Sequence, residues 1–95
     1  MTKTTVRLAK LSLGQTVITS NAMSVLSHVD VLTALSRHVR GDWGDLCQED
    51  WQANEKALID GGRLFSVYMA ESKLKFYVIT EWDRSVTTVL LPEDY

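Results

Sequence analysis

The sequence predicts an α+β domain in which about three helices pack on a C-terminal, three- to four-stranded antiparallel sheet. Two observations support this. Apolar residues recur with helical spacing through the first two thirds of the chain, whereas from Arg63 onward they alternate with a period of two. Short turn sequences divide the last third into three segments, as in an antiparallel meander. Ninety-five residues are enough for one such domain, so we expect residues 1–95 to form a single unit.

The first predicted elements are a strand and a short helix. Valine, leucine, isoleucine and threonine are frequent between residues 4 and 18. We therefore expect strand structure at Thr5–Leu13 and Thr16–Ile18. Ser20 is positioned to cap a helix over Asn21–His28.

Two longer helices follow. Asp30 begins an apolar pattern on one helical face that runs through Arg40, and Gly41 stands where a glycine commonly ends a helix. After a tight connection, Asp45 can cap a third helix that runs to the Gly61-Gly62 pair.

Three strands make up the predicted sheet. The first begins at Arg63, and the turn Glu71-Ser72-Lys73 leads into the second. A second turn, Asp83-Arg84-Ser85, leads into the third strand, Val86–Leu91, which Pro92 ends. We expect one face of this sheet to be wholly apolar and covered by the helices, and the other to be mixed and partly exposed.

Charge and composition exclude several classes of function. Residues 1–40 carry five basic and one acidic side chain, a net charge of +4, and residues 41–95 carry five basic and eleven acidic ones, a net charge of −6. A pI near 5.6 disfavours nucleic acid as a partner, since phosphate binding needs a concentrated basic face. Cys47 is the only cysteine, and we expect it to be buried or half-buried. No segment approaches the ~20 apolar residues of a membrane helix, and we expect a cytoplasmic protein.

The candidate catalytic residues are few. One cysteine and two separated histidines do not make a zinc site, and the glycines fall at helix boundaries, so we expect no metal and no cofactor. His38 is the one candidate general base, with Arg63 and Arg84 as phosphate stabilisers and Glu81 as an acid or orienting group. Small ribonucleases assemble such sets on an antiparallel sheet. The other interpretation is that His38 complements the C-terminus of its helix.

Tryptophans in turns beside aspartates are candidates for a binding surface. Tryptophan, tyrosine and arginine dominate the binding energy at the centres of contact surfaces, although a loop tryptophan can instead cap a small core. We expect replacement of Trp43 to weaken partner binding without unfolding the domain. A homodimer joined through an apolar edge at Val86–Leu91 is a further possibility. The candidate binding residues are Asp42, Trp43, Asp45, Trp82, Asp83 and Arg84.

Short motifs over residues 33–95 carry a family resemblance. They are Gly41-Asp42-Trp43-Gly44-Asp45-Leu46, Glu49-Asp50, Asn54, Gly62-Arg63-Leu64, Ile79-Thr80-Glu81, Asp83-Arg84-Ser85, Thr87-Thr88 and Leu91-Pro92-Glu93-Asp94-Tyr95. In these motifs the chain resembles the small "plasmid-related" proteins of bacterial plasmids, phages and integrated elements. Trp82 departs from the pattern, since the family typically has alanine or another residue there. The resemblance implies a setting rather than an activity, because small accessory proteins of mobile elements often bind host machinery, defence complexes included.

We therefore expect a non-enzymatic accessory protein of a mobile genetic element. It would bind a host or element protein, with inhibition of a defence or nucleic-acid-processing complex as one outcome. The alternative is a small metal-independent ribonuclease or toxin-like enzyme that uses His38, in which case His38→Ala would relieve toxicity on expression.

Overall fold

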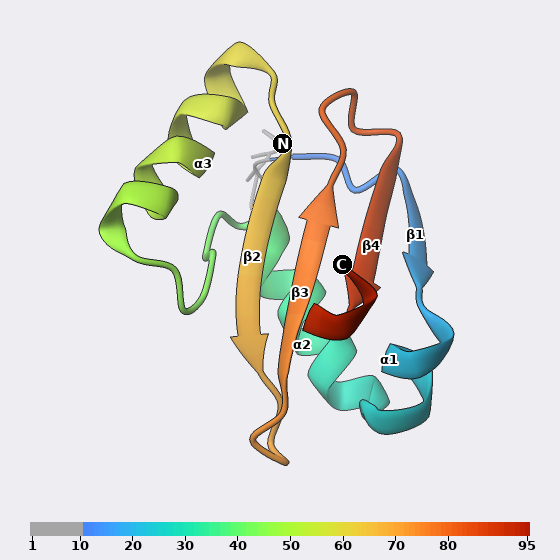
Figure 1. The fold of residues 1–95 in the computed structure, drawn as a ribbon. Helices are drawn as coiled ribbons and strands as arrows, with labels where there is room; N and C mark the ends of the chain where they lie inside the picture. Colours follow the sequence, from blue (N-terminus) through green and yellow to red (C-terminus); the bar gives the residue numbers. More distant parts are fainter. Residues whose placement is uncertain (1–10) are drawn as a thin grey trace, which may run out of the picture.

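Residues 11–95 are described by a computed structural model, in which three helices flank a four-stranded sheet (Figure 1). The predicted α+β class is confirmed. No helix in this part of the chain is long and apolar enough to cross a membrane. The elements, in chain order, are β1 (Gln15–Ile18), α1 (Ser20–Val25), α2 (His28–Val39), α3 (Gln48–Asp60), β2 (Leu64–Met69), β3 (Lys75–Thr80), β4 (Val86–Leu90) and the 3-10 turn η1 (Pro92–Asp94).

The sheet is mixed and is not the pure antiparallel meander that the sequence predicts. β2, β3 and β4 are antiparallel neighbours, as expected. β1 instead pairs parallel to β4, with Gln15 beside Val86 and Ile18 beside Val89. The parallel pair arises because the chain leaves β1, forms all three helices and enters the sheet again at the opposite edge. The strand order is β1-β4-β3-β2, so β4 is an inner strand and Val86–Leu91 cannot be the free edge of a dimer.

The first strand and helix differ from the prediction in their limits. Thr16–Ile18 lies within β1, whereas most of the predicted strand Thr5–Leu13 lies outside the described residues, and its described part is not strand. α1 begins one residue earlier than expected. Its cap is Thr19, whose hydroxyl accepts a hydrogen bond of 3.1 Å from the Ala22 N–H.

The caps of α2 and α3 also differ from the predicted ones. Ser27, rather than Asp30, caps α2, because its hydroxyl accepts the Asp30 N–H at 3.1 Å. α3 begins after Cys47 rather than after the aspartate two residues before it, and Cys47 is exposed rather than buried. Gly41 and Gly61 follow the two helices in the left-handed region, with φ of 81° and 80°, as the sequence predicts.

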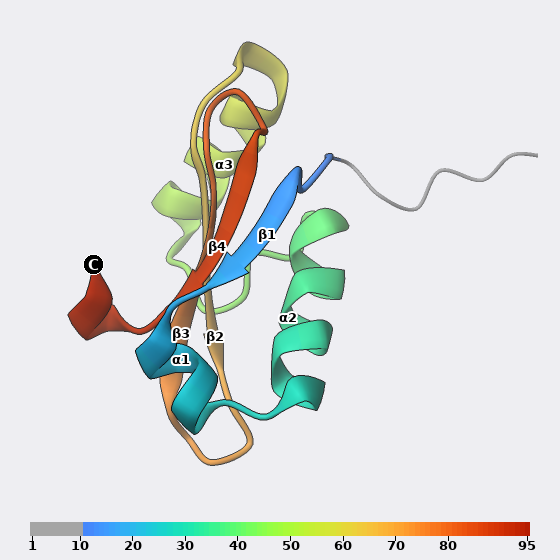
Figure 2. The same cartoon turned by 90° about the vertical axis from the view of Figure 1, so that its right-hand side faces the viewer.

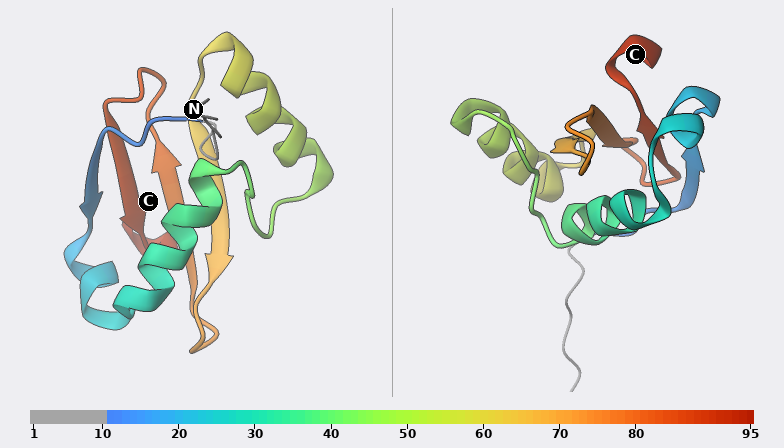
Figure 3. Two further views of the ribbon diagram at one scale, coloured as in Figure 1. Left: turned by 180° about the vertical axis from the view of Figure 1, so that it is seen from behind. Right: turned by 90° about the horizontal axis from the view of Figure 1, so that it is seen from below.

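The helices cover one face of the sheet and one edge. α2 lies across one face, α3 lies beside β2, and the opposite face is open between α3 and η1 (Figures 2 and 3). The prediction that the covered face is wholly apolar is wrong, since Ser66, Thr80 and Thr87 are buried on it. One cluster of the buried apolar core lies between this face and the first two helices and consists of Ala22, Leu26, Ala34, Tyr68, Ala70, Phe76, Val78, Val89 and Leu91.

The outer edge of β2 is covered by the loop before α3 and by a side chain of α3. The Val67 N–H donates to the Trp43 carbonyl at 3.1 Å, and the Asp45 N–H donates to the Val67 carbonyl at 2.8 Å, so the loop pairs like a short parallel strand. The Asn54 amide of α3 does the same for Phe65, donating to its carbonyl at 2.7 Å and accepting from its N–H at 3.2 Å. Sheet edges left unpaired invite aggregation. Asn54 therefore both closes this edge and holds α3 against it.

Replacement of Asn54 by leucine tests this role. The side chain is buried, and the substitution removes both hydrogen bonds to Phe65 while keeping a similar volume. We expect the free energy of unfolding to fall by about 2 kcal/mol, since an unsatisfied buried polar group costs about 1–3 kcal/mol. Urea denaturation measures the loss. Gln52→Leu on the exposed side of the same helix is the matched control, and an equal loss in both variants would contradict the assignment.

Candidate functional site

Asp42, the first predicted binding residue, holds the loop that follows α2. The Arg37 guanidinium donates to its two carboxylate oxygens at 2.7 and 3.2 Å, and its Oδ1 also accepts from the Gly44 N–H at 3.2 Å. The Tyr68 hydroxyl donates to the Asp42 carbonyl at 2.6 Å. The hydrogen bond from Arg37 is the main cause of a lowered pKa for Asp42. These contacts account for Asp42 without a partner.

Trp43 lies in the core. Its side chain is 0% exposed, and its ring meets the His38 ring edge to face, with centroids 5.4 Å apart. Gly44 follows with φ of 78°, and a β-carbon there would overlap the Val67 carbonyl oxygen. Trp43 therefore belongs to the core, which is the second use that the sequence leaves open for a loop tryptophan, and it is not part of an exposed binding surface. Asp45 alone among the three predicted residues of this loop is exposed.

His38 is fully buried at the centre of a polar chain. Its Nδ1 lies 2.6 Å from the Ser66 hydroxyl and its Nε2 lies 2.9 Å from the Thr80 hydroxyl. Thr80 and Thr87 are joined at 2.7 Å, and the Thr87 hydroxyl donates to the Leu13 carbonyl at 2.7 Å. The chain links α2, β2, β3, β4 and the segment before β1.

The direction of this chain determines the tautomer of His38. The Thr87 proton is used on a carbonyl, which can only accept, so Thr80 must donate to Thr87. Nε2–H must then donate to Thr80, and Nδ1 accepts from Ser66. Each hydroxyl and both ring nitrogens are satisfied with a neutral imidazole.

Burial lowers the pKa of His38 to about 4, with a smaller contribution from the positive charge of Arg84. A general base acts best when its pKa lies near the working pH and when it reaches the substrate. His38 has neither property in this conformation. Its environment is that of a structural histidine.

The other residues of the ribonuclease hypothesis face different partners. The Arg84 guanidinium donates to the backbone carbonyls of Gly62, Ala57 and Glu81, and so holds the β3–β4 turn against the end of α3. Arg63 lies on the open face, where it donates to the Tyr95 hydroxyl at 3.2 Å. The Glu81 N–H donates to the Val86 carbonyl at 3.0 Å, which closes the turn. Two arginines and a glutamate therefore do not surround His38.

The β3–β4 turn presents one large side chain to solvent. Asp83 Oδ1 accepts the Ser85 N–H at 3.1 Å and the Ser85 hydroxyl at 2.6 Å, and these bonds lower the pKa of Asp83. Arg84 occupies the left-handed region with φ of 62°. Trp82 is 69% exposed. Of the predicted residues here, Asp83 and Arg84 are explained by the turn and Trp82 is not.

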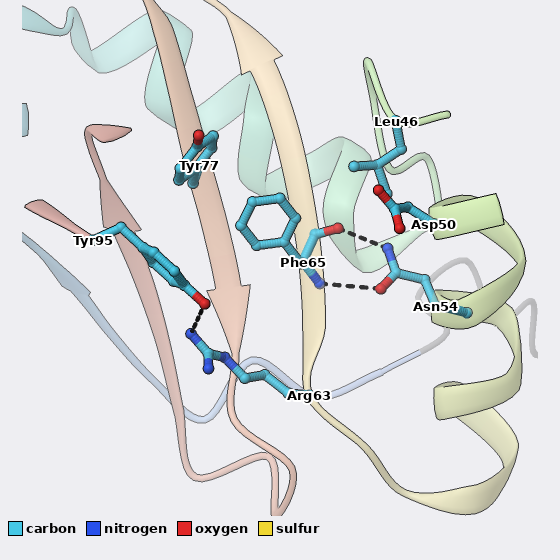
Figure 4. A pocket seen from close by; sticks show the side chains of 8 residues that line it. Leu46, Asp50, Asn54, Arg63, Phe65, Tyr77 and Tyr95 are labelled. Carbon is cyan, nitrogen blue, oxygen red and sulfur yellow. Dashed lines mark hydrogen bonds between the residues drawn. The ribbon is translucent and has the colours of Figure 1, made fainter. Parts of the chain in front are cut away.

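The open face of the sheet carries a groove that the sequence analysis misses (Figure 4). Its volume is about 400 Å³. It lies between α3 and Tyr95, with Phe65 and Tyr77 of the sheet at its centre (Figure 4). We call it the aromatic groove, and it is lined by Leu46, Asp50, Ala53, Asn54, Arg63, Phe65, Tyr77 and Tyr95.

Three aromatic rings form the centre of the aromatic groove. The centroids of Phe65 and Tyr77 are 4.8 Å apart, and Tyr95 lies 6.3 Å from the first and 6.2 Å from the second. Tyr95 is 70% exposed, although the Arg63 guanidinium lies 5.4 Å from its ring centroid and holds it in place. A pre-positioned ring that leaves most of its surface in solvent is available for contact with another molecule.

The polar character of the aromatic groove is set by its two sides. Asn54 is occupied by Phe65, and Arg63 by Tyr95. Asp50 lines the groove from the first turn of α3, where Glu49 is also exposed. The α3 side of the groove is therefore negative, whereas the Arg63 guanidinium beside Tyr95 keeps its positive charge, since a hydroxyl group does not neutralise it.

A signal for the groove is present in the sequence. Alternation in the predicted strands assigns Phe65 and Tyr77 to strand faces, but it does not give the register that brings them together. In the structure Phe65 is opposite Ile79 and Tyr77 is opposite Val67, so the two rings meet diagonally across β2 and β3. Tyr95 joins them only through the return of the chain after β4.

The chain matches no protein-family model, no curated protein and no solved structure in the comparisons made. Among residues 11–95, no group of three or more His, Cys, Asp or Glu side chains is placed to hold a metal ion. The chemistry of the site must therefore be judged from its own residues.

Proposed function

We propose that this chain is a non-enzymatic binding protein whose partner is another protein, contacted through the aromatic groove. The observation that carries the proposal is the cluster of Phe65, Tyr77 and Tyr95, left open on a sheet face that no helix of the described chain covers. The resemblance to small proteins of mobile elements supports a role as an accessory protein that binds a host or element protein. His38, the residue on which the enzymatic alternative depends, is enclosed in the core.

The residue types in the groove support a protein partner. Tyrosine and arginine are enriched where binding energy concentrates, and a concave aromatic patch with a polar border is typical of an interface centre. Arg63 holds Tyr95 in a fixed position before binding. Less conformational entropy is then lost when a partner docks.

The charges around the groove support a partner with a basic contact surface. Residues 41–95 carry a net charge of −6, and Asp50, which lines the groove, is exposed. Acidic and basic surfaces that face one another increase the association rate and select the partner. Proteins that process nucleic acid carry such basic surfaces. Occupying one of them would inhibit a defence or nucleic-acid-processing complex.

A pull-down from host lysate with groove variants tests the proposal. We expect the wild-type chain to retain one protein in stoichiometric amount. The double variant Tyr95→Ala, Asp50→Lys should retain about tenfold less of this protein or lower still, since removing an interface anchor costs ~2 kcal/mol or more of binding free energy. Both side chains are exposed, so the thermal melting temperature should stay close to that of the wild type.

Trp82→Ala is the matched control, because it removes an exposed aromatic side chain outside the groove. Retention of the partner by this variant supports the assignment. Equal retention by the groove variant and the wild type would contradict it, as would the absence of any stoichiometric protein partner. Cleaved or bound RNA without a protein would favour the enzymatic alternative instead.

A further inference from the structure

The outer edge of β1 is unpaired among the described residues. The Gln15 N–H donates to the Ser85 carbonyl at 2.9 Å and the Thr19 N–H donates to the Val89 carbonyl at 3.0 Å. Alternate residues of a strand direct their backbone groups to opposite sides, so the N–H and carbonyl groups of Thr16 and Ile18 are directed away from β4. β1 is the terminal strand of the sheet, and no described strand pairs with its outer side (Figures 1 and 2).

The two edges of the sheet are treated differently. At β2, Asn54 and the loop around Gly44 occupy the backbone groups of Phe65 and Val67. At β1, residues 15–18 contain no charge, no proline and no lysine, which are the usual protections of an exposed edge. An edge with these properties is suited to pair with another strand.

An apolar patch adjoins this edge. A hollow of about 370 Å³ between β1, α1 and α2 is lined by five apolar side chains and one histidine, with no Asp, Glu, Lys or Arg among its described lining residues. Met23 and Leu32 in it are 64% and 66% exposed. Figure 2 looks onto the β1 edge and shows α1 and α2 beside it. The lining residues are Ile18, Met23, Leu26, His28, Val31 and Leu32.

We propose that this edge and patch are the contact surface for a second copy of the chain, which pairs through antiparallel β1 strands. With Val17 on the two-fold axis, Thr16 faces Ile18 of the second copy, and Ile18 faces Thr16 of the second copy. Each of these pairs exchanges two hydrogen bonds, so four are formed. The two sheets would join into one of eight strands.

A second copy fits this surface better than an unrelated partner for two reasons. The free groups of Thr16 and Ile18 are symmetric about Val17, so the strand complements itself, as an isologous interface requires. The patch lacks charged lining residues, so two copies can approach it without burying like charges. A stable dimer buries about 800 Å² from each partner, so the proposed contact includes the apolar patch as well as the four-residue strand.

Disulfide trapping in the full-length chain tests the register. In a Cys47→Ser background, we expect Val17→Cys to form a covalent dimer on mild oxidation, because residues facing each other at a non-hydrogen-bonded antiparallel pair lie about 4.5 Å apart between Cα atoms, within disulfide range. Thr16→Cys is the matched control. It would face Ile18 of the second copy and should form no covalent dimer.

Sedimentation of the wild type and of Thr16→Pro provides the second measurement. Proline removes an outward N–H that β4 does not use, so the folded monomer should persist while the dimer is lost. We expect a wild-type dimer and a folded Thr16→Pro monomer. A wild type that is monomeric at about 100 µM would overturn the proposal, because a dimer of micromolar Kd would be mostly formed there. A dimer that survives Thr16→Pro, or equal cross-linking of the two cysteine variants, would overturn it as well.

Discussion

Trp43→Ala is expected to reduce the free energy of unfolding by about 3–5 kcal/mol, the range for removing a large buried aromatic side chain. The ring is completely buried and packs on His38 in the core. The free energy of unfolding of a small domain is only about 5–15 kcal/mol in total. The variant should therefore unfold at a much lower urea concentration or fail to fold. Denaturation followed by circular dichroism measures the change without relying on tryptophan fluorescence.

Trp82→Ala is the matched control for that experiment. Its side chain is 69% exposed, and exposed substitutions usually change stability by less than about 0.5 kcal/mol. The two variants thus separate a tryptophan of the core from one of the surface. A stable Trp43→Ala protein that has lost only partner binding would contradict the structure and restore the interpretation of Trp43 as an interface anchor.

Acidification is expected to destabilise the protein through His38. Its pKa is about 4 in the folded state, against an ordinary value of 6.5, because burial disfavours the charged ring. Between these two values the unfolded chain binds a proton that the folded chain does not. The free energy of unfolding is therefore unaffected by the titration of His38 above about pH 6.5 and falls as the pH is lowered toward 4. The total decrease is about 3 kcal/mol, at 1.36 kcal/mol for each pH unit.

His38→Gln isolates this contribution. Glutamine can donate to Thr80 and accept from Ser66 but does not titrate. We expect the stability difference between wild type and variant to narrow as the pH falls from 6.5 to 4. His28→Gln, which replaces the other histidine at an exposed position, is the matched control. Parallel profiles for the wild type and His38→Gln would show that His38 titrates alike in both states.

The sequence predicts the local elements better than their assembly. The period-two alternation from Arg63 and the short turns are enough to place β2, β3 and β4, and Gly41 and Gly61 mark the helix ends. The parallel pairing of β1 with β4 joins residues that are 71 positions apart in the chain, which no local pattern encodes. For the same reason the sequence analysis predicts a free sheet edge at Val86–Leu91, whereas the edge strand of the sheet is β1.

The candidate site is harder to predict because polar residues have two uses. Thr80 and Thr87 look like surface residues of a strand, yet they satisfy a buried histidine. Asp42 looks like a binding residue, yet it orders its own loop. Which use applies depends on partners distant in the sequence. An exposed aromatic residue such as Tyr95 is informative only once its neighbours are known.

The most direct test of the central claim, that the partner binds at the aromatic groove, is to titrate the captured partner into this chain and follow its backbone amide signals by NMR. If the aromatic groove binds the partner, amide signals of Asp50, Phe65 and Tyr77 should shift or broaden on titration, while those of Trp82 and Asp83 stay in place. Changes confined to the β3–β4 turn, with the groove signals unmoved, would contradict the account.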